Sequence, residues 1–201
     1  MRVTVISPPA PVVTWEEADA HLRLDGDEEQ RPMVERLIAA ATAHIDGPAG
    51  WLGRALGPQT LEARICGFGG GLIRLLYPPI VDIVSVHYLD GMGQPALVDP
   101  DTYELFGPDL GTAWGKSWPT PGAYRGRVET VRIRYRAGYP VDPNADPVVP
   151  SVPEPIKAAI LLMVGDLYKF PETASDMNLS PVAIPMSTTV TNLLSPFRIW
   201  C

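Results

Sequence analysis

Apolar residues recur at helical spacing in the segment 31–45, where they stand three or four positions apart and share one face. Pro32 falls in the first turn of this expected helix, where a missing amide hydrogen costs little. A shorter helix is expected before it, because Thr14 and Glu17 have the spacing of a capping box. The pattern therefore predicts two helices within residues 14–46.

A third helical pattern begins at Pro155 and continues to about Phe170. Its apolar positions, which include Ile156, Ile160 and Met163, cover a broad face. A face of this breadth indicates burial on more than one side, by the protein's own core and by a neighbouring subunit.

Between residues 59 and 139 the pattern changes to the alternation that is typical of β-strands. The cleanest strand covers 131–137, where every second residue is apolar. Four further strands are expected, over residues 59–66, 72–76, 83–89 and 103–106. In the third of these, strict alternation places Val84 on the same side as Val86.

Helical segments on either side of a β-rich stretch indicate an α+β fold, a small helical bundle with a β-rich insertion and an extended C-terminal arm. The expected organisation has an N-terminal arm, one domain and a C-terminal arm. Their bounds are 1–13 for the first arm, 14–170 for the domain (helices 14–46 and 155–170, β-rich insertion 59–139) and 171–201 for the second arm.

The composition is that of a globular protein, with 46% hydrophobic and 19% charged residues in a chain of 201. A net charge of −7 argues against a protein whose main task is to grip nucleic-acid phosphates. No apolar run is long enough for a signal peptide or a membrane span, so we expect a soluble protein made in the cytoplasm.

The sequence shows no residue pattern typical of catalysis or of metal binding. His21, His44 and His87 fall on separate expected elements, whereas zinc needs three or four converging ligands. The glycine-rich run 67–71 lacks the Lys-Ser/Thr ending of a phosphate-binding loop. We therefore expect no catalytic residue, no cofactor and no metal.

Arg132, Arg134 and Arg136 share one face of the strand 131–137, and Arg125 and Arg127 come just before it. One interpretation is contact with the DNA backbone. The other is ion pairing with acidic residues, in the same chain or on a neighbouring subunit. The negative net charge favours ion pairing between subunits.

An apolar cluster follows the polar, proline-interrupted segment near the C-terminus. Such a cluster is costly to leave in water, and segments of this kind often dock on a partner; the alternative is that it folds back on the protein's own core. The candidate contact residues are Val190, Leu193, Leu194, Phe197, Arg198 and Trp200.

Short motifs also follow one another in a fixed order from about residue 14 to residue 198. They are Thr14-Trp15-Glu16-Glu17-Ala18, Gly53-Arg54-Ala55-Leu56, Gln59-Thr60, Pro78-Pro79-Ile80, Ala137-Gly138-Tyr139, Pro155-Ile156-Lys157-Ala158-Ala159-Ile160 and Leu193-Leu194-Ser195-Pro196-Phe197-Arg198. In this order the motifs resemble the head–tail connector, or adaptor, family of long-tailed bacteriophages and gene transfer agents.

The resemblance implies a structural protein rather than an enzyme. This structural protein would form a homo-oligomeric ring of about a dozen copies beneath the portal. The ring would extend the DNA channel and join head to tail, with a stopper or tail-joining protein below it. DNA would pass without sequence-specific binding, and no membrane would be involved. The implied location is the head–tail interface of a virion or gene transfer agent particle, made in the host bacterial cytoplasm.

In this view the C-terminal cluster is expected to contact the portal, and the arginines Arg132, Arg134 and Arg136 to contact a neighbouring subunit or DNA. The alternative is a DNA-contacting packaging or head-completion factor that uses the face formed by the three arginines.

Overall fold

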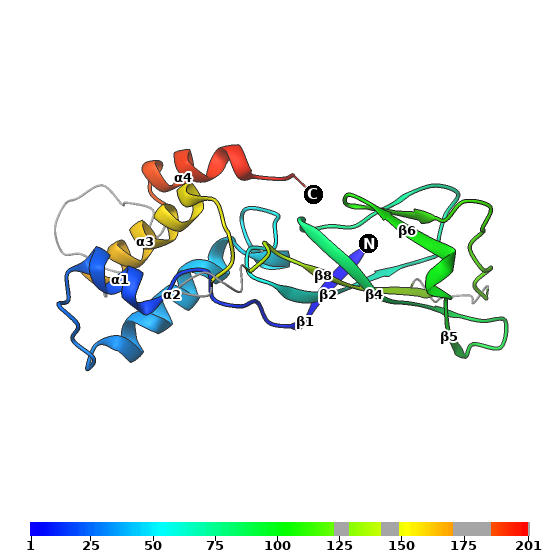
Figure 1. Ribbon diagram of the computed structural model, residues 1–201, viewed down its shortest axis with the longest axis horizontal. Coiled ribbons are helices and arrows are strands. Elements are labelled where there is room, and N and C mark those ends of the chain that lie inside the picture. Colours follow the sequence, from blue (N-terminus) through cyan, green and yellow to red (C-terminus); the bar gives the residue numbers. More distant parts are fainter. Residues whose placement is uncertain (123–128, 142–148, 171–185, 201) are drawn as a thin grey trace.

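Helices gather at one end of the molecule and strands at the other, as Figure 1 shows. The computed structural model describes residues 1–122, 129–141, 149–170 and 186–200. Arg125, Arg127 and Cys201 lie outside the described residues, as does the first part of the expected C-terminal arm, 171–185.

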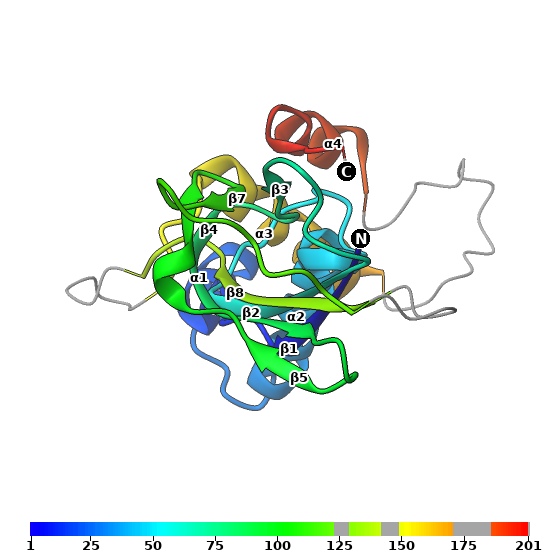
Figure 2. The same cartoon turned by 90° about the vertical axis from the view of Figure 1, so that its right-hand side faces the viewer.

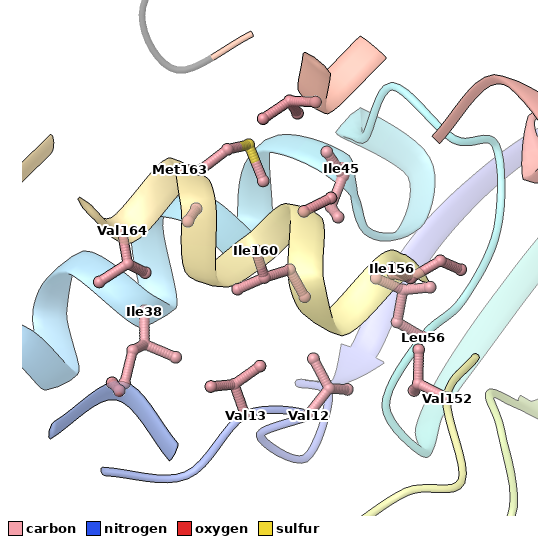
Figure 3. Packing of buried hydrophobic residues seen from close by; sticks show 14 of the residues in the cluster. Val12, Val13, Ile38, Ile45, Leu56, Val152, Ile156, Ile160, Met163 and Val164 are labelled. Carbon is pink, nitrogen blue, oxygen red and sulfur yellow. The ribbon is translucent and has the colours of Figure 1, made fainter. Parts of the chain in front are cut away.

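The helical end is built from α1 (Trp15–Leu22), α2 (Arg31–Ile45), α3 (Glu154–Lys169) and α4 (Thr188–Leu194). The expected capping box begins α1: the Glu17 amide donates to Thr14 Oγ1 at 3.2 Å, and the Thr14 amide donates to Glu17 Oε2 at 2.9 Å. Apolar side chains of α2, α3 and α4 then meet in one buried cluster, with α3 in the middle (Figure 3).

The strand end holds two antiparallel sheets. The larger has the order β1-β2-β8-β4-β5, with bounds Arg2–Ser7, Gln59–Ile65, Val131–Ala137, Ile80–Leu89 and Pro95–Leu97. The smaller has the order β3-β7-β6, with bounds Ile73–Arg74, Asp109–Thr112 and Tyr103–Phe106. A second apolar cluster, separate from the helical one, joins the two sheets. Figure 2 looks along the molecule from this end. The expected α+β class is confirmed.

Sequence expectations differ from the structure at the N-terminal arm and at Val84, among other places. Part of the expected N-terminal arm is the edge strand β1, and Val12 and Val13 after it are buried in the helical cluster. Val84 is exposed although Val86 is buried. The reason is a bulge in β4 between Ile83 and Ser85, which inserts an extra residue and turns Val84 away from the core.

The two clusters meet at a polar junction around Asp46, which is buried at the end of α2. One carboxylate oxygen, Oδ1, accepts hydrogen bonds from the Leu56 amide at 2.6 Å and from Gln59 Nε2 at 3.2 Å. Close backbone contacts complete the junction, because a Cβ on Gly57 would stand 2.0 Å from the carbonyl oxygen of Ala10. The helical end and the sheet end are therefore tied together by specific contacts.

Candidate functional site

The outer face of the larger sheet carries the three arginines of β8. Arg134 Nη2 donates to Glu62 Oε2 at 3.0 Å, and Arg136 Nε donates to Asp82 Oδ1 at 2.7 Å. The Arg132 side chain has no hydrogen-bond or ion-pair partner among the described residues. Two of the three arginines thus make ion pairs within the chain. The ion-pair interpretation allowed such pairs either within the chain or between subunits.

These ion pairs set the charge states of their carboxylates. Burial raises the pKa of Glu62, but hydrogen bonds from Arg134 and Arg64 outweigh burial and lower the pKa below its ordinary value of 4.5. The hydrogen bond from Arg136 lowers the pKa of Asp82 in the same way. Both carboxylates are therefore ionised at neutral pH and neutralise positive charge on this face.

A hollow of 440 Å³ opens on the same face, lined in part by Arg132, Arg134, His87 and Ser85. Arg134 Nε is buried there and has no hydrogen-bond partner among the described residues. Guanidinium and hydroxyl donors of this kind suit an anionic oxygen group, such as a carboxylate. The ionised Glu62 carboxylate also lines the hollow and offsets one of its two guanidinium charges.

The C-terminal segment packs on the helical bundle through α4. Val190 and Leu194 are fully buried in the helical cluster, whereas Leu193 and Phe197 lie at its border. The alternative of folding back on the protein's own core therefore holds for Val190 and Leu194. The structure does not bring all six candidate contact residues to one exposed surface.

The chain end is fixed to the loop that follows α2. The Ile199 amide donates to the Leu52 carbonyl at 2.8 Å, and Arg54 Nε donates to the Phe197 carbonyl. The Arg198 guanidinium contacts two indole rings, at 4.0 Å from the centroid of Trp51 and 3.7 Å from that of Trp200.

These contacts leave the outer side of Trp200 open, since this side chain is 79% exposed. We call the border residues Leu193, Phe197, Arg198 and Trp200 the C-terminal ledge. Trp51 and Arg54 were not identified from the sequence as residues that hold the C-terminal ledge in place, although Arg54 belongs to one of the motifs that carry the resemblance.

The three histidines lie on α1, α2 and β4. Among the described residues, no group of three or more His, Cys, Asp or Glu side chains could hold a metal ion. In the same part of the chain, no helix has the length and apolarity that a membrane span requires.

No family model and no curated protein matches the sequence. Solved structures do match the fold. The whole of this chain aligns with 97% of a chain in the virion of the native gene transfer agent particle, with a TM-score of 0.72 and 18% identity.

The fold of this chain is also similar to that of chains in gene transfer agent necks. A chain in the neck of the empty particle, computed with C6 symmetry, gives the same TM-score of 0.72 at 18% identity. A chain in the neck of the native particle, computed with C12 symmetry, gives 0.65 at 16% identity. Each neck alignment covers 100% of this chain and 97% of the other.

The likeness to these chains extends over the helices and both sheets, since the alignments cover 100% of this chain. At identities of 16–18% it is a likeness of fold. It agrees with the family to which the ordered sequence motifs pointed.

Proposed function

We propose that this protein is a head–tail connector, an adaptor subunit that forms a ring beneath the portal. The ring extends the DNA channel and supplies the surface on which a stopper or tail-joining protein docks. The observation that carries the proposal is the full-length likeness to chains of gene transfer agent necks, with a TM-score of 0.72. One of these necks was computed with C12 symmetry, which a closed ring of like subunits satisfies.

The portal contact in this proposal is the C-terminal ledge. Trp200 and Arg198 offer a large aromatic surface beside a positive charge, a combination that is enriched where protein interfaces derive most of their binding energy. Val190 and Leu194 serve the contact indirectly, because their burial holds α4 on the bundle.

A DNA-contacting packaging or head-completion factor is the competing function. It requires a face whose arginines are available to phosphate groups. Arg134 and Arg136 are instead paired with Glu62 and Asp82, which leaves Arg132 as the remaining candidate on β8. This pairing favours the connector over the DNA-contacting factor, and DNA passes the ring without sequence-specific contact.

The test is deletion of the gene in the producing strain, followed by negative-stain imaging of the particles. We expect heads beside separate, finished tails, because the joint between them is missing. Complementation with the wild-type gene should restore tailed particles. Intact tailed particles from the deletion strain contradict the proposal.

A further inference from the structure

The two edges of the larger sheet are open over matching stretches. β1 pairs only with β2, so its outer edge has no partner strand among the described residues. On the opposite side, β5 covers only His87–Leu89 of β4, so no strand in the described part of the chain pairs with this edge over residues 80–85. Open edges are ordinarily protected, because their free amide and carbonyl groups invite pairing with another chain.

Both open edges carry exposed aliphatic side chains. Val5 and Ile6 on β1 are 45% and 46% exposed, and Val81 and Val84 on β4 are 53% and 51% exposed. Ile6, Val81 and Val84 each occupy a position where the strand register shifts, so a bulge turns each of them out of the regular ladder. The sheet therefore presents an apolar pair on each side.

The two apolar pairs lie at the same level along the strands. Val5 is in register with Leu61, Leu61 with Tyr135, and Tyr135 with Ile83. Ile83 stands between Val81 and Val84 in the sequence. A line across the sheet from Val5 thus ends among the exposed valines of the opposite edge.

Strand direction also fits a repeated contact. Each step from β1 through β2 and β8 to β4 is antiparallel, so β1 and β4 run in opposite directions. If a second copy is placed beside the first and rotated by a small angle about an axis parallel to the strands, its β1 lies antiparallel to β4 of the first copy. Each further copy can repeat the contact.

We infer that neighbouring copies of this chain join edge to edge, with Val5 and Ile6 of one copy packed against Val81 and Val84 of the next. The contact uses two different surfaces, so it is head-to-tail and closes a ring when the rotation between copies divides a full turn. The inference rests on the proposed ring and specifies the surfaces that form it. The bulges limit backbone pairing at these edges, so side-chain packing provides most of the contact.

Cysteine cross-linking tests the contact directly. The variant carries Ile6→Cys and Val84→Cys in a chain whose own cysteines are changed by Cys66→Ser and Cys201→Ser. Under mild oxidation of a concentrated sample we expect a ladder of disulfide-linked dimers, trimers and larger species. The matched control is Met92→Cys with Trp114→Cys in the same background, since these residues are more exposed, at 87% and 100%, and lie outside β1 and β4. No ladder from the edge pair, or an equal ladder from the control pair, overturns the inference.

Single-cysteine chains show whether the contact is head-to-tail. A mixture of the Ile6→Cys chain and the Val84→Cys chain should give a covalent dimer several-fold faster than either chain alone. Homodimers of the Ile6→Cys chain alone, formed at least as fast as the mixed dimer, contradict the head-to-tail geometry. This result can be told apart from that of the gene deletion. If cross-linking gives no ladder but the deletion strain shows unjoined heads and tails, the connector proposal holds and only the assignment of these surfaces is rejected.

Discussion

A single carboxyl group, that of Asp46, joins the helical cluster to the sheet cluster. Burial raises the pKa of Asp46 above its ordinary value of 3.8, although hydrogen bonds from Leu56, Gln59 and Gly47 oppose the rise. An acid whose pKa is raised by folding stabilises the folded state below its unfolded pKa, and this contribution is lost as pH rises through the folded pKa.

Replacement by asparagine should remove this pH dependence. We expect the unfolding free energy of Asp46→Asn, relative to wild type, to increase as pH rises from about 3 to about 7. Urea denaturation over this pH range measures the difference, with Asp25→Asn in the exposed turn before α2 as the control. If the difference in unfolding free energy between Asp46→Asn and wild type stays constant with pH, folding does not raise the pKa of Asp46.

Glu62 should show the opposite trend. Arg134 and Arg64 lower the pKa of Glu62 below 4.5, so its stabilising contribution is present above that value and is lost as pH falls through the folded pKa. Glu62→Gln should therefore reduce the unfolding free energy by about 1–2 kcal/mol at neutral pH. The reduction should disappear in acid, and the same urea titrations detect it. A loss of equal size at every pH indicates a packing defect instead.

At the scale of elements, α4 depends on α3. A seven-residue helix is too short to be stable alone, so burial of Val190 and Leu194 against the bundle must hold it in place. Leu194→Ala should lower the unfolding free energy by about 3 kcal/mol, because it leaves a cavity in the cluster. Asn192→Ala on the exposed side of α4 should change it by less than about 0.5 kcal/mol. Equal effects of the two substitutions in urea denaturation contradict this packing.

The elements that depend on local signals were predictable from the sequence. The helix expected at 31–45 and the strand expected at 131–137 have those bounds in the structure, because the periodicity of apolar residues lies within each segment. The helix expected from Pro155 to about Phe170 is α3, shifted by one residue at each end.

Features that depend on distant partners were not predictable. The outward turn of Val84 follows from the register between β4 and β8, which are far apart in the sequence. The alternation in β8 predicted that Arg132, Arg134 and Arg136 share a face, but pairing with Glu62 and Asp82 follows from the strand order. Nothing local to Arg198 indicates that it lies against Trp51, since the two residues meet only when the chain end returns to the bundle.

At the scale of the whole molecule, the two proposed contacts belong to different elements. The C-terminal ledge is carried by α4 and the residues after it, whereas the subunit contact uses β1 and β4. A change in one surface should therefore leave the other working. Variants of the two surfaces should consequently fail at different steps of assembly.

This separation predicts different genetic behaviour for the two kinds of variant. Trp200→Asp keeps both sheet edges, so it should enter mixed rings and impair their docking to the portal. The double variant Ile6→Asp with Val84→Asp lacks both edge contacts, so it should stay out of the rings. In a strain that also makes the wild-type chain, Trp200→Asp should sharply reduce the yield of tailed particles, whereas the edge variant should leave it unchanged.

Particle counts by negative stain measure these yields, and Trp114→Asp, at a fully exposed tryptophan on the sheet end, serves as the control for an added surface charge. Circular dichroism must show that each variant is folded. A dominant edge variant contradicts the assignment of the subunit contact to β1 and β4. A recessive Trp200→Asp contradicts the assignment of the portal contact to the ledge, because a subunit with intact edges cannot be excluded from the ring. The edge variant therefore tests the subunit contact by itself, and the Trp200→Asp variant then tests the portal contact in rings built through that subunit contact.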